Sequence, residues 1–140
     1  GVGADGFDDP SLDALAGDDP TVLDKVFFGT LAPAVPGSRI DEFQKQCAEI
    51  DMEVSGLFPS LGADMIKIVA YGVKASGSID PVAIREAIRS AKEIPVMSVE
   101  SITFDGTNSY ALREIPVIGF KDGKRVVLSQ EIPANVPSWP

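Results

Sequence analysis

The chain is 140 residues long and carries a formal net charge of −9, from 21 acidic and 12 basic residues. Hydrophobic residues make up 44 % and charged residues 24 % of it, a composition typical of a folded domain and unlike that of a disordered chain. The negative charge would repel a polyanion, so we exclude nucleic acid as a partner. The absence of histidine removes the commonest general base and metal ligand, which disfavours most hydrolase and zinc chemistry.

The first third of the chain predicts one short helix and one strand. Asp9-Pro10 places a capping carboxylate before a proline that suits the first helical position, and Gly17 is a natural end for that helix. Asp19-Pro20 predicts a turn. Residues 25–31 are rich in β-branched and aromatic side chains, which predicts a buried strand.

The middle of the chain predicts three helices. The first follows Ser38, which with Asp41 resembles a capping box, and its inward stripe is Ile40, Phe43, Cys47 and Ile50. The second covers residues 61–76, with an apolar face of Leu61, Met65, Ile68, Val69, Gly72 and Val73 and a polar face of Asp64, Lys67, Tyr71 and Lys74. The third begins at Asp80-Pro81 and ends near Pro95, with an inward stripe of Ile84, Ala87, Ile88 and Ala91.

After Pro95 the apolar period changes to two, which indicates strands. Residues 99–104 predict one strand, and residues 115–120 and 126–128 predict two more, joined by a type I′ turn at Asp122-Gly123. The proline-rich tail, residues 133–140, predicts irregular structure. Strands at both ends with helices between them predict the α/β class, with helices layered on a parallel or mixed sheet.

The first six residues, Gly-Val-Gly-Ala-Asp-Gly, match the glycine pattern of dinucleotide-binding loops. We disfavour a nucleotide site because no strand precedes the pattern and because Asp5, Asp8 and Asp9 would place negative charge where the phosphates sit. The aspartates up to Asp24 also lack the spacing of a calcium-binding EF-hand loop, and we interpret them as helix caps and solubilising charges. Asp5 stands apart, because it follows an expected strand end, where α/β folds place ligand-binding groups; an ordinary turn aspartate is the alternative.

The remaining candidate residues indicate no catalysis. Cys47 lies in a core stripe and has no histidine partner, so we interpret it as a small buried hydrophobe. Phe58, at the start of the long helix, either forms a pocket wall or packs against the helix end. We therefore predict no catalytic residues, no metal site and no cofactor, and a protein that is not an enzyme.

Short stretches follow one another in a characteristic order at residues 3–7 (Gly-Ala-Asp-Gly-Phe), 11–17, 25–31, 55–58 (Ser-Gly-Leu-Phe), 77–81, 101–105 and 121–124 (Lys-Asp-Gly-Lys). This order resembles the C-terminal portion of branched-chain amino-acid-type extracellular solute-binding proteins of ABC transporters, which have the type I periplasmic binding fold. In that family two α/β lobes close on a ligand, and the chain crosses between them three times.

The resemblance implies that residues 1–30 and 113–140 belong to the second lobe and residues 31–112 to the first. Each lobe would be incomplete, and the exposed sheet edges would favour pairing with another chain, as in a homo-oligomer. It also implies that Asp5 receives the ammonium group of the ligand, that Phe58 lines the pocket for the ligand side chain, and that Phe7 is a weaker neighbour.

The function implied is capture of an amino acid or a similar small carboxylate or amide and its delivery to an ABC permease in the membrane. The location implied is periplasmic or extracellular, with a lipid anchor possible in the full-length protein. A ligand-sensing domain of a receptor or regulator with the same fold is the alternative. Residues 99–101 and 106–109 depart from the family pattern, and aspartate in place of glutamate at position 5 leaves urea-like solutes and aromatic acids open as ligands.

Overall fold

The computed structural model describes residues 1–104, 106 and 110–134. Its strands are β1 (Val2–Gly3), β2 (Phe27–Gly29), β3 (Ile94–Pro95), β4 (Ser101–Ile102), β5 (Ile115–Lys121) and β6 (Lys124–Glu131). Its helices are η1 (Asp5–Phe7), α1 (Pro10–Ala14), η2 (Pro20–Leu23), α2 (Arg39–Ala48), α3 (Phe58–Ser76) and α4 (Pro81–Arg89), where η marks a 3-10 helix. The sequence predictions above also name residues 105, 107–109 and the tail from residue 135 onward, which lie outside the described residues. No helix within the described ranges has the length and apolar character needed to cross a membrane.

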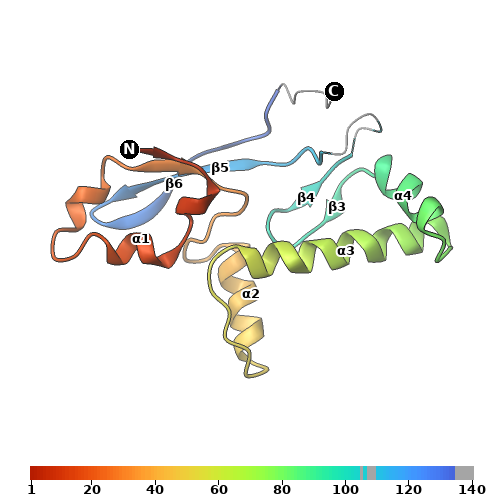
Figure 1. Ribbon diagram of the computed structural model, residues 1–140, viewed down its shortest axis with the longest axis horizontal. Coiled ribbons are helices and arrows are strands. Elements are labelled where there is room, and N and C mark those ends of the chain that lie inside the picture. The colour runs from red at the N-terminus through yellow and green to blue at the C-terminus, as the bar shows by residue number, and fades with distance from the viewer. Residues whose placement is uncertain (105, 107–109, 135–140) are drawn as a thin grey trace.

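Both ends of the chain contribute to one four-stranded sheet with the order β1-β2-β5-β6. β1 runs parallel to β2, whereas β5 is antiparallel to both of its neighbours. Figure 1 shows the first strands, in red and orange, beside the last strands, in blue, with α1 beneath them. The core under this sheet contains Leu23, Phe28, Ile118 and Phe120. We call residues 1–29 and 115–131 the sheet part, and its mixed sheet confirms the expected fold class.

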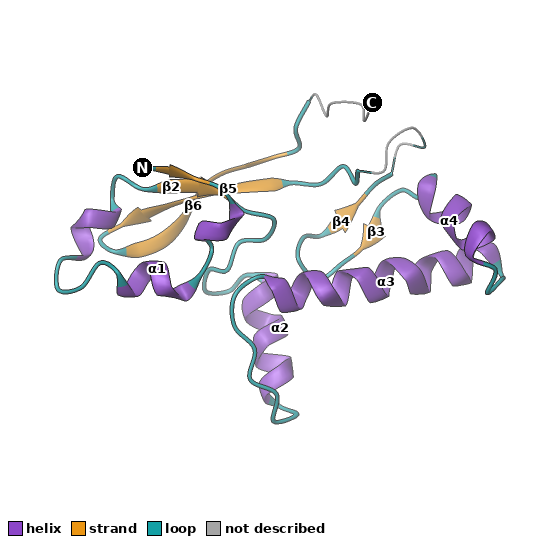
Figure 2. Ribbon diagram, in the orientation of Figure 1, coloured by secondary structure: helices purple, strands orange, loops and turns teal. Residues whose placement is uncertain are grey.

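Residues 39–102 form a second unit, which we call the helical part. α3 packs along α4 and against β3, and β3 pairs with β4 in a small antiparallel sheet (Figure 2). The core of the helical part contains Ala91, Ile94, Val96, Val99 and Ile102. α2 projects away from both sheets (Figure 2), and its first turn is held because Ile40 packs with Ala32 and Leu57.

Three capping predictions and the hairpin turn are confirmed, whereas Asp19-Pro20, expected to start a turn, opens the 3-10 helix η2. The side chains of Asp9, Ser38 and Asp80 accept hydrogen bonds from backbone N–H groups in the first turns of α1, α2 and α4. Asp122 and Gly123 have φ angles of 52° and 70°, as a type I′ turn requires, and they join β5 to β6.

The face of α3 that packs inward differs from the predicted one. Asp64, expected on the polar face, is only 5 % exposed, whereas Met65 and Val69, expected inside, are 68 % and 50 % exposed. The physical reason is that the Asp64 carboxylate accepts backbone hydrogen bonds from Met97 and Ser98, which makes its burial tolerable. The helix therefore turns Asp64 inward and leaves part of its apolar surface exposed.

Other boundaries were also predicted wrongly, and α4, for example, ends at Arg89 and not near Pro95. Ile50 is exposed rather than inward, because α2 ends at Ala48 and the chain turns before it. The strand expected over residues 99–104 is reduced to the two residues of β4, and its partner β3 was not predicted. Both are very short, so little apolar periodicity marks them.

Close packing between α3 and α4 depends on Gly72. A Cβ atom at this position would lie 2.8 to 2.9 Å from side-chain atoms of Ile84 and Ile88. We expect Gly72→Val to destabilise the chain by about 1–3 kcal/mol through overpacking, measured by denaturant unfolding. Gly62 on the same helix is the matched control: a Cβ there has no atom within 4 Å, so Gly62→Ala should stabilise by up to about 1 kcal/mol. Equal effects of the two substitutions would contradict the packing argument.

Candidate ligand-binding site

The turn after β1 carries the first candidate residue. The chain leaves the carboxyl end of β1 and forms η1, where Asp5 is exposed. Phe7 folds back over the strand so closely that a Cβ at Gly3 would lie 2.3 Å from the ring, which requires glycine there. The rings of Phe7 and Phe28 meet edge to face, with centroids 6.3 Å apart. Phe7 therefore anchors the turn on the sheet part, and Asp5 stays at the surface.

Asp8, the residue that follows η1, anchors this turn to the sheet part. Its carboxylate is buried and accepts a hydrogen bond of 2.6 Å from Thr30 Oγ1 and another from the guanidinium of Arg125. Burial raises the pKa of Asp8, while the hydrogen bond from Thr30 and the charge of Arg125 act in the opposite direction. The interpretation of Asp8 as a cap or a solubilising charge is therefore wrong; it is the centre of a buried polar cluster.

Arg125 brings the C-terminal hairpin to the same cluster. Its guanidinium carbon lies 5.8 Å from the ring centroid of Phe28 and 5.9 Å from that of Phe120, within reach of a cation–π interaction. It also donates to the Asp9 carbonyl oxygen at 2.7 Å and to the Asp13 carboxylate at 3.2 Å. Through Arg125, strand β6 thus fixes the backbone that follows η1.

Phe58 lies at the first position of α3, and its side chain is 66 % exposed. The residues around it are fixed: Leu57 is fully buried, and Ser60 Oγ donates to the Leu57 carbonyl oxygen at 2.6 Å. Gly56 lies next to the turn of the sheet part, since a Cβ built there would be 4.0 Å from the Asp8 carbonyl oxygen. The fold thus brings the segment that begins α3 beside the segment that carries Asp5 and Phe7.

A second buried polar cluster lies between the helical part and the segment that leads into β5. Ser98 Oγ donates to the Asp64 carboxylate, and the Arg113 guanidinium donates to Ser98 Oγ at 2.7 Å. The same guanidinium donates to the carbonyl oxygen of Leu31, just after β2. Burial lowers the pKa of Arg113, while the charge of Asp64 opposes this effect.

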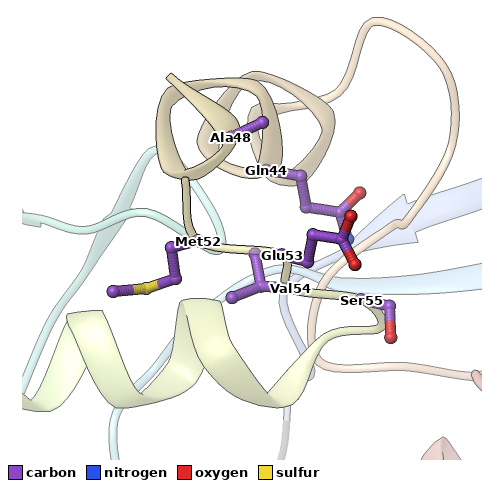
Figure 3. A pocket seen from close by; sticks show the side chains of 6 residues that line it. All are labelled: Gln44, Ala48, Met52, Glu53, Val54 and Ser55. Atoms are coloured by element: carbon purple, nitrogen blue, oxygen red, sulfur yellow. The ribbon is translucent and has the colours of Figure 1, made fainter. Parts of the chain in front are cut away.

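Two hollows adjoin the candidate segments. The smaller, of about 180 Å³, is lined by Asp8, Arg125, Ser55 and Gly56 among others. The larger, of about 440 Å³, lies between α2 and the segment before α3 (Figure 3), and its lining residues are Gln44, Ala48, Met52, Glu53, Val54 and Ser55. The hollows share Gln44 and Ser55, so they adjoin one another. Neither is lined by Asp5, Phe7 or Phe58.

The described part of the chain contains no group of three or more His, Cys, Asp or Glu side chains arranged to hold a metal ion. Its chemically prominent residues are instead the members of the two polar clusters, which sequence reasoning missed: Asp8, Thr30, Arg125, Asp64, Ser98 and Arg113. No local motif marks them. The only available signal was Asp64 itself, which is flanked by apolar residues and is the only carboxylate on this helix.

The topology defines the fold class. A mixed sheet built from both ends of the chain, with a helical part inserted between its strands, is the arrangement of part of a two-lobed type I periplasmic binding fold. No protein-family profile matches the chain, and no curated protein matches it. The class therefore rests on similarity of structure.

Solved structures that are similar to the chain include the following three. A leucine-binding protein, LivK, from Thermotoga maritima has a TM-score of 0.68 and 21 % identity, covering 94 % of this chain and 37 % of its own. LivJ from Streptococcus pneumoniae, a branched-chain amino acid transporter substrate-binding protein in complex with isoleucine, has a TM-score of 0.62 and 18 % identity, covering 94 % and 36 %. An ABC-transporter solute-binding protein from R. palustris in complex with benzoate has a TM-score of 0.65 and 18 % identity, covering 97 % and 37 %. The chain thus has the fold of these proteins over little more than a third of their length.

The Asp8 cluster predicts unequal effects for two partners of one guanidinium. The Asp8 side chain is 0 % exposed and that of Asp13 is 43 % exposed, although both contact Arg125. We expect Asp8→Ala to destabilise the chain by roughly 3–5 kcal/mol, because it removes the buried partner of Arg125 and the acceptor of the buried Thr30 hydroxyl. Asp13→Ala should cost at most about 1 kcal/mol, as for an exposed ion pair. Denaturant unfolding of both variants measures the effect. Similar losses in the free energy of unfolding would contradict a stabilising role of the buried contact between Asp8 and Arg125.

Proposed function

We propose that the chain is part of a solute-binding protein that captures an amino acid or a similar small carboxylate or amide for an ABC importer. The likeness of its fold to three solute-binding proteins of ABC transporters is the observation that carries this proposal. One of the three is a leucine-binding protein, another is a branched-chain amino acid transporter substrate-binding protein in complex with isoleucine, and the third is in complex with benzoate. In the full-length protein, the partner is a membrane permease and the location is periplasmic or extracellular.

Asp5 is the proposed partner of the ligand ammonium, and Phe58 and Phe7 are proposed to flank the ligand. The arrangement supports this assignment, because Asp5 is exposed beyond the carboxyl end of a strand and the start of α3 lies beside that turn. A carboxylate pairs with an ammonium group by a charge-assisted hydrogen bond, and an aromatic ring offers an apolar wall. Neither requires a cofactor, and the proposed role is binding without catalysis.

The sheet part is proposed to belong to the second lobe and the helical part to the first. The exposed apolar surface of α3 supports the view that the first lobe is incomplete here. Phe58, Met65, Ile66 and Val69 are 50 to 73 % exposed and recur at helical spacing along one side of α3, whereas Lys67 and Lys74 lie on another side. Such a stripe normally packs on a second layer. We propose that the remainder of the full-length protein supplies that layer.

The ligand contact is tested in the full-length protein. A thermal-shift screen of amino acids and aromatic acids first identifies the ligand, and calorimetry then measures its affinity. Asp5→Ala should weaken binding by about 1.5–3 kcal/mol, the value of a hydrogen bond to a charged group, or roughly 10- to 100-fold. Asp18→Ala, at an exposed turn position, is the control and should bind as the parent does. Unchanged affinity in Asp5→Ala would refute its role.

The lobe assignment is tested by making the same substitution in two contexts. Because Met65 and Val69 are exposed, changing both to lysine should alter the stability of the isolated 140 residues by no more than about 0.5 kcal/mol. In the full-length protein the same change should cost at least about 2 kcal/mol, since it buries charge in a packed layer. Lys67→Ala should be nearly neutral in both contexts. A neutral result in the full-length protein would show that the stripe is not covered.

A further inference from the structure

Two chain segments join the sheet part to the helical part. The first leaves β2 at Thr30 and Leu31 and leads to α2, and the second runs from β4 to β5 and contains Arg113. The two segments touch where the Arg113 guanidinium donates to the Leu31 carbonyl oxygen, across 82 positions of sequence. Both crossings are therefore held together at one point, directly beside the sheet.

The same guanidinium also reaches the helical part. It donates to Ser98 Oγ at 2.7 Å, and Ser98 in turn donates to the carboxylate of Asp64 in α3. Asp64 accepts backbone hydrogen bonds from Met97 at 2.5 Å and from Ser98 at 3.2 Å, so this loop cannot shift without breaking several contacts. Arg39, at the start of α2, donates to the neighbouring Val96 carbonyl oxygen at 2.8 Å. The loop that Arg113 grips is thus rigidly tied to both α2 and α3.

On the other side, the crossing that Arg113 grips is tied to the sheet part. Thr30 is buried, and its hydroxyl donates to Asp8 behind the η1 turn at 2.6 Å and lies 3.2 Å from the Ala32 carbonyl oxygen. Leu31, which accepts from Arg113, is the next residue. A path of polar contacts, joined by the peptide bond between Thr30 and Leu31, therefore runs from the turn that carries Asp5, through Arg113, to the helix that begins with Phe58.

Arg113 is poorly suited to a purely stabilising role. It is only partly exposed, and its Nε is buried without a hydrogen-bond partner among the described residues. An unpaired buried donor costs free energy, and a well-packed apolar residue commonly stabilises as much as a buried charge or more. What an apolar residue cannot provide is the Nη2 group of the guanidinium, which donates to the crossing at Leu31 and to the helical part at Ser98 at once.

We propose that Arg113 is a positioning residue that fixes the angle between the sheet part and the helical part, and so the placement of Phe58 relative to Asp5. The Asp64–Ser98 pair is its anchor in the helical part, and the Leu31 carbonyl is its anchor at the crossing. Its relevance to ligand capture rests on the proposed function, but the geometric role does not.

The angle is measured by double electron–electron resonance between nitroxide labels. The labels are placed by Lys121→Cys on β5 and Lys74→Cys on α3, both exposed positions in different parts, in a Cys47→Ala background. Arg113→Lys keeps the charge but ends one bond short of the Nη2 position, and Ser98→Ala removes one anchor while leaving the rest of the core. We expect both to shift and broaden the distance distribution. Arg85→Ala, which removes an exposed ion pair with Glu86, should leave it unchanged.

Circular dichroism of each variant shows whether the chain remains folded. If Arg113→Lys and Ser98→Ala are folded and give the parent's distance distribution, the proposal is wrong. If Arg113→Lys fails to fold, an unchanged distribution in Ser98→Ala is sufficient to refute it. Broadening in Arg85→Ala as well would also overturn it, because the effect would not be specific to the clamp. The readout uses no ligand, so a failed ligand screen leaves this result intact, and a negative distance result leaves the ligand proposal intact.

Discussion

The buried contact between Asp8 and Arg125 is the constraint on which the sheet part depends. Asp8 finds one partner 22 positions away, in Thr30, and the other 117 positions away, in Arg125. These three residues bring together the turn after β1, the exit of β2 and strand β6. Because each buried polar group needs a partner, the two ends of the chain can adopt only the arrangement that satisfies this carboxylate. The exposed turn with Asp5 is held in place as a result.

The helical part also contains a buried carboxylate whose hydrogen-bond donors come from a distant segment of the chain. Asp64 is buried by α3 and is satisfied by the loop at Met97 and Ser98, as Asp8 is satisfied by Thr30 and Arg125. The two clusters meet at adjacent residues, since Thr30 belongs to one and Leu31 accepts from the other. The segment that leaves β2 is therefore held by Asp8 at Thr30 and by Arg113 at Leu31. Satisfied buried polar contacts rigidify a structure, and among the described residues the Nε of Arg113 is the one buried side-chain donor in this network that has no hydrogen-bond partner.

The elements that sequence predicted well are those whose chemistry is local. A cap such as Asp9 needs only the next few residues, and the Asp122-Gly123 turn needs only its own backbone. The buried carboxylates could not be predicted, because their partners lie tens of positions away and because a lone aspartate is usually a surface residue. The inward face of α3 was predicted wrongly for the same reason. The pattern of apolar residues favoured an inward face that contains Met65 and Val69, whereas the hydrogen bonds of Asp64 determine which face of the helix packs against the core. The approach of Gly56 to Asp8, which brings the candidate segments together, also exists only in three dimensions.

The exposed candidate residues are distinct from the buried residues that hold them in place. Asp5 and Phe58 are exposed, and each is held through its backbone by buried neighbours that do not share its surface: Asp8 behind the first, Leu57 and Ser60 behind the second. Side chains at the surface can then change without loosening the scaffold, because the scaffold's contacts are made elsewhere. By the same reasoning, a substitution in one of the two buried polar clusters would change the position of the surface residues relative to one another. It would leave the chemistry of those surface side chains unchanged.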